Sequence, residues 1–301
     1  MSTTHVWSDR LDRRVTPFLL IGPFFGLFAI FGLFPLLYTA WISLHRWHLV
    51  GGGEGFVGVD NYTRLLSDPL FYNAMLNTVS IFILATFPQM FAALGLAALL
   101  NQPLRGPTFW RASVLMPNVV SVATIGLVFG QLYANDYGVV DYLLRSLGLP
   151  AIDWHGNRLT SHLAISTMVA WRWTGYNALL YLAAMQSVPQ ELYDAAALDG
   201  ASRWRTFWSI TVPGIRPTLI FTVVVSTISG LQLFAEPQLF DSSGSGGASR
   251  QFQTLAMYLY EKGFNQFNAG YAATIAWVMC LFCVGFALVN FVLVRKIASK
   301  D

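Results

Sequence analysis

The stretch PQELYDAAALDGASRWRTFWSITVPGIRP, residues 189–217, decides how this chain is organised. It is a long polar segment that lies between two strongly apolar ones. Glu191 and Asp194 stand near its start, and Arg203 and Arg205 come later. Because this order of charges complements a helix dipole, the first part of the segment is predicted to be a short helix.

The second part of the segment carries the signals for a joint and another helix. Gly200 offers a break, and the apolar residues between 204 and 210 recur with the spacing of one helix face. We expect this second helix to stop before Pro213 and Pro217, because proline disrupts a helix interior. The segment therefore predicts a helix, a glycine joint and a second short helix.

This pattern closely resembles the EAA loop of permease subunits of ABC importers, in which Glu-Ala-Ala, Gly and Ile-x-Leu-Pro follow one another at fixed spacing. The matching positions are Asp194, Ala195, Ala196, Gly200, Ile210 and Pro213. Asp194 replaces the usual Glu and Val212 the usual Leu, and both exchanges keep the chemistry. The residues around the motif look most like the maltose-type branch, which imports oligosaccharides. The alternative is an amphipathic loop that only caps a membrane helix.

The composition is that of a membrane protein. Hydrophobic residues make up 55% and charged residues 11% of the 301 residues, and the mean hydropathy is +0.52. Soluble domains carry about a quarter charged residues. The net charge of +3 is small and the basic residues form no stripe, so nucleic acid is not an expected partner.

Six apolar segments are long enough to be membrane-spanning helices, since about 20 residues cross about 30 Å of hydrocarbon. They cover residues 18–44, 75–100, 112–133, 161–185, 218–234 and 271–294. The predicted fold is therefore all-α, a polytopic membrane protein with segment 189–217 between the fourth and fifth helices. The predicted organisation is a cytoplasmic N-terminal segment (1–16), a six-helix permease domain (17–295) and a cytoplasmic tail (296–301).

The positively charged residues predict the orientation. Eleven of them share one side with both termini and segment 189–217, namely Arg10, Arg13, Arg14, Arg105, Arg111, Arg203, Arg205, Arg216, Arg295, Lys296 and Lys300. Six fall on the other side, namely Arg46, Arg64, Arg145, Arg158, Arg250 and Lys262. Since cytoplasmic loops are rich in Lys and Arg, both termini and the segment are predicted to be cytoplasmic.

Polar side chains inside the spans are the candidates for a solute pathway, because such groups are costly in hydrocarbon. Thr222, Ser226, Ser229, Gln232 and Glu236 fall within about 120° of one helix face, so they either line a path or pack against other helices. Arg172 lies about 16 Å along its helix from the span's start, near the midplane. It is expected to pair with an acidic group such as Glu236 or to bind sugar hydroxyls directly.

Aromatic and amide side chains accompany Arg172. Trp173, Tyr176 and Asn177 follow it closely, and these aromatic residues, like Trp171, suit stacking on sugar rings, although aromatic residues at helical spacing also pack. Asn118 in the third span is a weaker candidate. The predicted solute-binding residues are Arg172, Trp173, Tyr176, Asn177, Asn118, Gln232 and Glu236. Cys280 and Cys283 are predicted to be small core residues, without redox or metal chemistry.

The chain lacks the signals of an enzyme. It has no G-x-x-x-x-G-K-[ST] phosphate loop and no protease motif, so we expect it to bind no cofactor or metal itself. The resemblance implies that ATP and Mg²⁺ are used by a partner ATPase, on which the 189–217 loop docks as a coupling helix. It further implies two ATPase subunits, a second and different permease, an external solute-binding protein, and a place in a bacterial or archaeal inner membrane.

Two rival functions differ from a sugar importer. An importer of the same architecture for glycerol phosphate would need several cations near the pathway, and Arg172 is the one cation at depth in the sequence. A secondary transporter would need ligands for a coupling ion and, commonly, an inverted repeat, and neither is visible in the sequence.

Overall fold

The computed structural model describes residues 4–241 and 244–298, and almost all of its elements are helices. Contacts divide the chain into two units. Unit 1 consists of the residues up to 66 together with 262–277, and unit 2 of residues 67–261 together with those from 278 onward. Residues 1–3 of the predicted N-terminal segment and 299–301 of the predicted tail lie outside the described residues.

Unit 1 begins with a continuous helical run. It consists of α1 (Thr4–Phe28), the π-helical turn η1 (Ala29–Leu33) and α2 (Phe34–Ser43). Residues 16–43 are long and apolar enough to cross a membrane, as the sequence predicted. The π-helical turn precedes Pro35. Because Pro35 has no N–H for the carbonyl four residues earlier, a local change of helical pitch is expected there.

Unit 1 also contains a small β-sheet, which the sequence did not predict within this mostly helical chain. Strand β1 (His45–His48) pairs antiparallel with β2 (Gly52–Phe56). The turn between them passes through Gly51 at φ +107°, a conformation that glycine adopts readily. Helix α3 (Asp60–Leu66) follows.

Unit 2 is built around a pair of long helices, α4 (Pro69–Leu100) and α8 (Arg158–Met185). Both begin at a side-chain cap. The Leu70 N–H donates to Asp68 Oδ1 at 2.9 Å, and the Leu159 N–H donates to Asn157 Oδ1 at the same distance. These caps satisfy backbone donors at the helix starts, and they explain why the helices start earlier than the apolar segments do.

The third predicted span is not one continuous helix. Helix α5 (Pro107–Val119) and helix α6 (Val122–Leu132) meet at an angle of 88°. The break arises because Val120 and Ser121 adopt extended backbone angles, with ψ 139° and 134°. Apolar composition continues through the break, which is why the sequence alone predicted a single helix.

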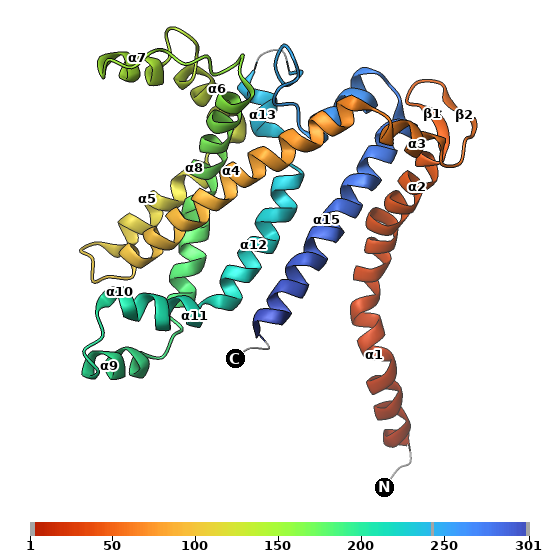
Figure 1. Ribbon diagram of the computed structural model, residues 1–301. Coiled ribbons are helices and arrows are strands. Elements are labelled where there is room, and N and C mark those ends of the chain that lie inside the picture. Colours follow the sequence, from red (N-terminus) through yellow and green to blue (C-terminus); the bar gives the residue numbers. More distant parts are fainter. Residues whose placement is uncertain (1–3, 242–243, 299–301) are drawn as a thin grey trace. The chain divides into compact units, whose positions relative to one another are not determined.

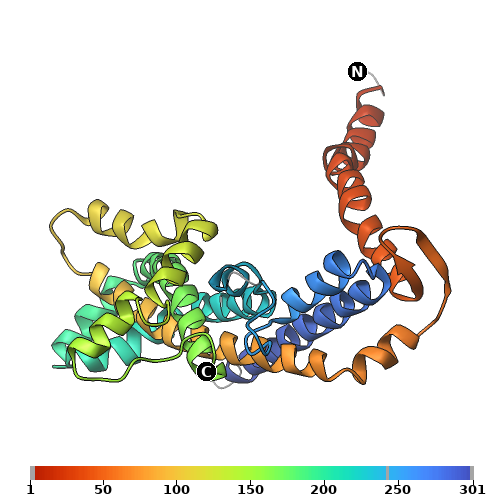
Figure 2. The same cartoon turned by 90° about the horizontal axis from the view of Figure 1, so that it is seen from above.

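The remaining elements of the chain are short except for α12 and α15. They are α7 (Val139–Ser146), α9 (Gln190–Leu198), α10 (Arg203–Thr206), η2 (Phe207–Thr211), α11 (Val212–Gly214), α12 (Arg216–Leu231), α13 (Ala235–Phe240), α14 (Leu255–Tyr260), η3 (Glu261–Asn265) and α15 (Ala269–Ala298). Within unit 2 the α4–α5 turn lies at the same end as α9 and α10 (Figures 1 and 2). Helices α7 and α13 lie at the opposite end (Figure 1).

Three helices of the described residues are long and apolar enough to cross a membrane, and each of two bent pairs could be one further span. The three are residues 16–43, 69–100 and 269–289, and the pairs are α5 with α6 and α10–α11 with α12. Helix α8 is not among them, although it is 28 residues long, because it carries many polar residues. The six-helix topology therefore stays a prediction.

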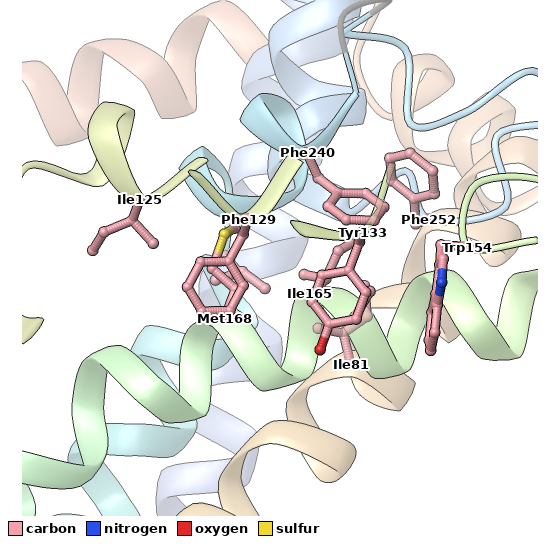
Figure 3. Packing of buried hydrophobic residues seen from close by; sticks show 11 residues of the cluster. Ile81, Ile125, Phe129, Tyr133, Trp154, Ile165, Met168, Phe240 and Phe252 are labelled. Atoms are coloured by element: carbon pink, nitrogen blue, oxygen red, sulfur yellow. The ribbon is translucent and has the colours of Figure 1, made fainter. Parts of the chain in front are cut away.

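Two apolar clusters form the core of unit 2. One joins aliphatic residues of α4 and α8 to aromatic residues of α6, α13 and the connecting segments, and Figure 3 shows the rings of Phe129, Tyr133 and Phe240 lying together. The Tyr133 ring lies 4.8 Å from that of Trp154, in an edge-to-face arrangement that aromatic rings favour. The second cluster joins α4 and α8 to Ile215, at the start of α12.

The two cysteines are placed differently from each other. Cys283 is half-buried, whereas Cys280 is exposed, so the prediction of two core residues was wrong for Cys280. The reason is that other residues cover only part of the α15 surface.

Candidate functional site

An internal cavity of about 310 Å³ lies in unit 2 between α4, α8, α12 and the start of α13. Its volume falls within the range of about 300–1,000 Å³ that is usual for small-molecule sites. The predicted solute-binding residues that line it are Arg172, Trp173, Tyr176, Asn177, Gln232 and Glu236. The four on α8 lie on one broad helix face because Arg172 and Tyr176, and likewise Trp173 and Asn177, are four residues apart.

Asn118 is the exception among the predicted solute-binding residues. It lies in α5 and does not line this cavity. The bend between α5 and α6 explains the difference, because it turns the third predicted span away from the straight path on which the prediction rested.

Arg172 and Glu236 form an ion pair at the cavity wall, which is one of the two roles expected for Arg172. Arg172 Nη1 lies 2.7 Å from Glu236 Oε1, and the side chains are 22% and 6% exposed. The guanidinium also lies over the ring of Trp173, 5.5 Å from its centre, at cation–π distance. The pair joins α8 to α13 although the two residues are far apart in the sequence. Burial of both charges requires this pairing, since an isolated buried charge is strongly unfavourable.

Five further polar side chains at the cavity have no hydrogen-bond partner among the described residues. The side chains of Gln89, Tyr176, Asn177, Ser226 and Ser229 make no hydrogen bond to any residue that the structure describes. All of them are uncharged, and amides and hydroxyls can each donate and accept hydrogen bonds. The cavity thus combines several uncharged hydrogen-bonding groups with the aromatic rings of Trp173 and Tyr176, an arrangement suited to a solute with many hydroxyl groups.

Sequence reasoning missed the contribution of α4. Thr86 and Gln89 line the cavity from that helix, and Gln89 is only 4% exposed. The signal was present, because two polar residues three apart beside Pro88 interrupt the apolar residues between 81 and 100. Their spacing places them on one helix face.

The polar stripe of the fifth span divides between the two expected roles. Ser226, Ser229, Gln232 and Glu236 line the cavity, as expected for a path. Thr222 does not, because its hydroxyl is hydrogen-bonded to the buried Tyr181 hydroxyl at 2.8 Å. Helix packing is therefore the role of Thr222. Trp171 also packs, with its ring 5.5 Å from that of Phe129.

Segment 189–217 forms the helix, glycine joint and second helix that its sequence predicted. Helix α9 ends in a Schellman motif, in which the Gly200 N–H donates to Ala197 and the Ala201 N–H to Ala196. Gly200 has φ +69°, the left-handed conformation that this motif requires. Ser202 then caps α10 by accepting from the Arg205 N–H at 3.3 Å.

The second helix of the segment runs further than predicted. It continues through η2 and α11 past Pro213, and it bends by 67° only at Ile215. The expectation that it stops before Pro213 was wrong because the π-helical turn η2 precedes Pro213, and such a local change of pitch accommodates a residue that has no N–H to donate. In η2 the Val212 N–H donates to the Phe207 carbonyl, the longer reach of a π-helical turn.

One end of segment 189–217 is anchored in the core while much of the rest is exposed. Ile215 is 1% exposed and packs with residues of α4 and α8. The Tyr193 and Thr211 hydroxyls are 3.1 Å apart and tie α9 to η2. In contrast, Leu198 is 90% and Trp204 72% exposed. Asp194, Ala195, Gly200 and Pro213 are exposed, and Ala196 and Ile210 are half-buried.

A carboxylate orders the loop before α8, at the end of unit 2 opposite to α9. Asp153 Oδ1 accepts hydrogen bonds from the Gly156 N–H and from Asn135 Nδ2, each at 2.8 Å. These bonds, that of Gly156 above all, hold the pKa of Asp153 below its usual value of 3.8. Among the described residues, no group of three or more His, Cys, Asp and Glu side chains could hold a metal ion.

Comparisons with known proteins agree over nearly the whole chain. Residues 70–299 match the model of the family described as "Binding-protein-dependent transport system inner membrane component". The chain is 34% identical to a lactose transport system permease protein of Rhizobium radiobacter, over 98% of this chain and 99% of the relative. It is also 34% identical to a trehalose/maltose transport system permease protein of Thermococcus litoralis, over 82% and 83% of the two chains.

A solved structure has a similar fold. A chain of a bacterial alginate ABC transporter, solved in complex with an alginate pentasaccharide-bound periplasmic protein, superposes with a TM-score of 0.82. The likeness covers 97% of each chain at 21% sequence identity, so it concerns the fold alone.

Proposed function

The chain belongs to the family of binding-protein-dependent transport system inner membrane components, and on this premise we propose that it is the permease subunit of an ATP-driven importer of a sugar or oligosaccharide. The observation that carries the proposal is the cavity between α4, α8 and α12, with its unpartnered uncharged polar groups and its aromatic rings. The lactose and trehalose/maltose permeases among its relatives support the same class of cargo.

Segment 189–217 is the proposed contact with the ATPase. Its exposed apolar side chains, Leu198 and Trp204 among them, offer a surface to a partner, while Ile215 anchors it between α4 and α8. A displacement of α9 and α10 would therefore be passed to the two helices that also line the cavity. In the proposed mechanism, ATP closes the ATPase dimer, the coupling helices move together, and the cavity opens outward to accept the solute.

The proposed assembly contains two permeases, two ATPase subunits and an external solute-binding protein. One coupling segment serves one ATPase subunit, so a second permease is required, which we propose to be a different chain. Both termini and segment 189–217 lie in the cytoplasm in this proposal, and α8 is the fourth of six spans within a permease domain at 17–295. ATP and Mg²⁺ belong to the ATPase subunits, and this chain contributes no catalytic residue.

Reconstituted transport tests this function. The chain and its companion subunits are placed in proteoliposomes with ATP inside, and uptake of lactose, maltose and trehalose is measured with the cognate solute-binding protein outside. We expect uptake of a sugar that stops without ATP. Uptake that continues without the ATPase and collapses with an ionophore would instead indicate an ion-coupled transporter, and ATP-dependent uptake of glycerol phosphate alone would indicate the rival cargo.

A matched pair of variants tests the site. Asn177→Ala and Asn118→Ala remove the same group, but only Asn177 lines the cavity. We expect Asn177→Ala to raise the KM for the transported sugar several-fold, since a hydrogen bond is worth about 0.5–1.5 kcal/mol, and Asn118→Ala to leave it unchanged. Equal effects of the two variants would remove the cavity from the pathway.

A further inference from the structure

The cavity carries no net charge. Among the described residues that line it, Arg172 and Glu236 are the charged ones, and each is the other's partner at 2.7 Å. An anionic solute would need an unpaired cation, because phosphate and carboxylate groups bind most strongly to Arg and Lys donors. To use Arg172, such a solute would have to displace Glu236. That displacement would leave a buried carboxylate without a partner, which is strongly unfavourable.

Gln89 is a buried polar residue at the cavity whose side-chain hydrogen-bonding capacity is unused among the described residues. It is 4% exposed, and its Nε2 is buried with no partner. No hydrogen bond joins its side chain to any described residue. An unsatisfied buried amide is unfavourable unless a ligand completes it, and a sugar hydroxyl, which both donates and accepts, can satisfy either end of an amide.

We propose that Gln89 is a solute-contacting residue that reads a hydroxyl group, and that the cavity selects uncharged polyhydroxylated solutes over phosphorylated or carboxylated ones. The proposal rests on the proposed transport function and adds a residue and a rule of selection to it. The uncharged side chains around Gln89, those of Tyr176, Asn177, Ser226 and Ser229, provide hydrogen-bonding partners for further hydroxyl groups. The Arg172–Glu236 pair excludes anions by occupying the one cation at the cavity.

Binding to the purified assembly of permeases and ATPases, without the solute-binding protein, tests the rule of selection. Radiolabelled lactose is displaced by unlabelled lactose or by lactose 6-phosphate, which differ only by the phosphoryl group. Maltose and maltose 6-phosphate serve as a second pair. For the wild type we expect the phosphorylated sugar to compete at least about tenfold more weakly. Equal competition by the two members of a pair would overturn the proposal.

The variant Glu236→Gln tests the physical cause. It nearly preserves the shape of the side chain while freeing Arg172, so the preference for the neutral sugar should fall by about tenfold or reverse. An unchanged ratio in a variant that elutes as the intact assembly would overturn the role of the ion pair. If Glu236→Gln does not assemble, the double variant Arg172→Gln/Glu236→Gln is used instead, because it removes both charges. This double variant should still prefer the neutral sugar. Loss of that preference would overturn the proposal.

Gln89→Leu tests the contact itself. We expect the affinity for the neutral sugar to fall about threefold to tenfold, the range that corresponds to one hydrogen bond. A series of monodeoxy lactoses gives the readout that a structural role would not change. Removal of the one hydroxyl that Gln89 contacts should weaken binding of the sugar to the wild type but not to Gln89→Leu. Gln89→Asn, a smaller change, replaces the leucine variant if that variant does not assemble.

The matched control is Gln131→Leu. Gln131 belongs to α6 and does not line this cavity, so its replacement should leave the affinity for the neutral sugar unchanged. Unchanged affinities and an unchanged deoxy pattern in both Gln89 variants would overturn the role of Gln89. Failure of the wild-type assembly to bind any neutral sugar would instead overturn the proposed function, so the two failures are distinguishable.

Discussion

Gly175 lies where α5 crosses α8 most closely, and its replacement by alanine should separate the two helices. A Cβ atom at this position would lie 1.8 Å from the Val114 carbonyl oxygen and 2.7 Å from its carbon. Ordinary contact begins at 3.4 Å, so the backbones must move apart by about 1.6 Å. No rotamer change relieves this clash because the opposing atoms belong to the backbone.

Two terms of opposite sign set the size of the effect. Overpacking costs about 1–3 kcal/mol, and replacing glycine by alanine in a helix interior returns about 0.5–1 kcal/mol. We therefore expect Gly175→Ala to destabilise the protein by about 1–2 kcal/mol and to lower its melting midpoint by about 2 to 6 °C. Uptake should fall as well, because Tyr176 and Asn177 follow Gly175 directly and line the cavity.

Heating the purified assembly and measuring by size exclusion the fraction that stays intact gives the midpoint. Gly95→Ala in α4 is the matched control, since no atom lies within 4 Å of a Cβ atom there. That variant should keep the wild-type midpoint or exceed it slightly. If Gly175→Ala and Gly95→Ala have the same midpoint, the close approach of α5 to α8 does not exist in the folded protein.

Three other predictions concern the coupling segment, the helix core and the outer loop. Gly200→Val should uncouple ATP hydrolysis from uptake, because the left-handed backbone at this position costs a β-branched residue at least about 1–2 kcal/mol. Gly200→Asn should stay coupled, because asparagine tolerates this conformation better. The same number of ATP molecules hydrolysed per sugar taken up in both variants would refute this. Tyr181→Phe should lose about 1 kcal/mol of stability through its bond to Thr222, with an unchanged KM, and an altered KM would contradict its packing role. Because the pKa of Asp153 is held below 3.8, its ordering of the loop should be complete above that pH and lost as pH falls through the lower folded value. Amide exchange at residues 153–156, corrected for intrinsic rates, should thus be slower at pH 5 than at pH 3 in the wild type but not in Asp153→Ala; a pH-independent wild type would exclude this role.

The coupling proposal depends on a continuous mechanical connection. The bend at Ile215 joins the exposed coupling segment to α12, and the side chain of Ile215 packs on both α4 and α8. The same three helices form most of the cavity wall. A movement at the segment's surface therefore has a route of packed atoms to the solute, and this route requires no change in the hydrogen bonds inside each helix.

The sequence alone determined the features that depend on local order and on composition. The apolar content predicted a membrane protein, and the spacing of Asp194, Gly200 and Pro213 predicted the jointed segment and the family. The charge of Arg172 within an apolar span also predicted that it needs a partner, with an acidic group such as Glu236 as one of the two alternatives, because an unpaired charge in hydrocarbon is costly. Each of these inferences needs only neighbouring residues or a single physical requirement.

Only the tertiary structure decided which polar side chains meet. Gln89 lines the cavity although it lies among apolar residues of its span, whereas Asn118 and Thr222 do not, and periodicity could not separate them. The 88° break between α5 and α6 was equally invisible, since the apolar pattern continues across it. Helical periodicity fixes which residues share a face. The crossing of the helices decides which residues that face contacts. The crossing in turn depends on close approaches between segments far apart in the chain, such as that of Gly175 to Val114.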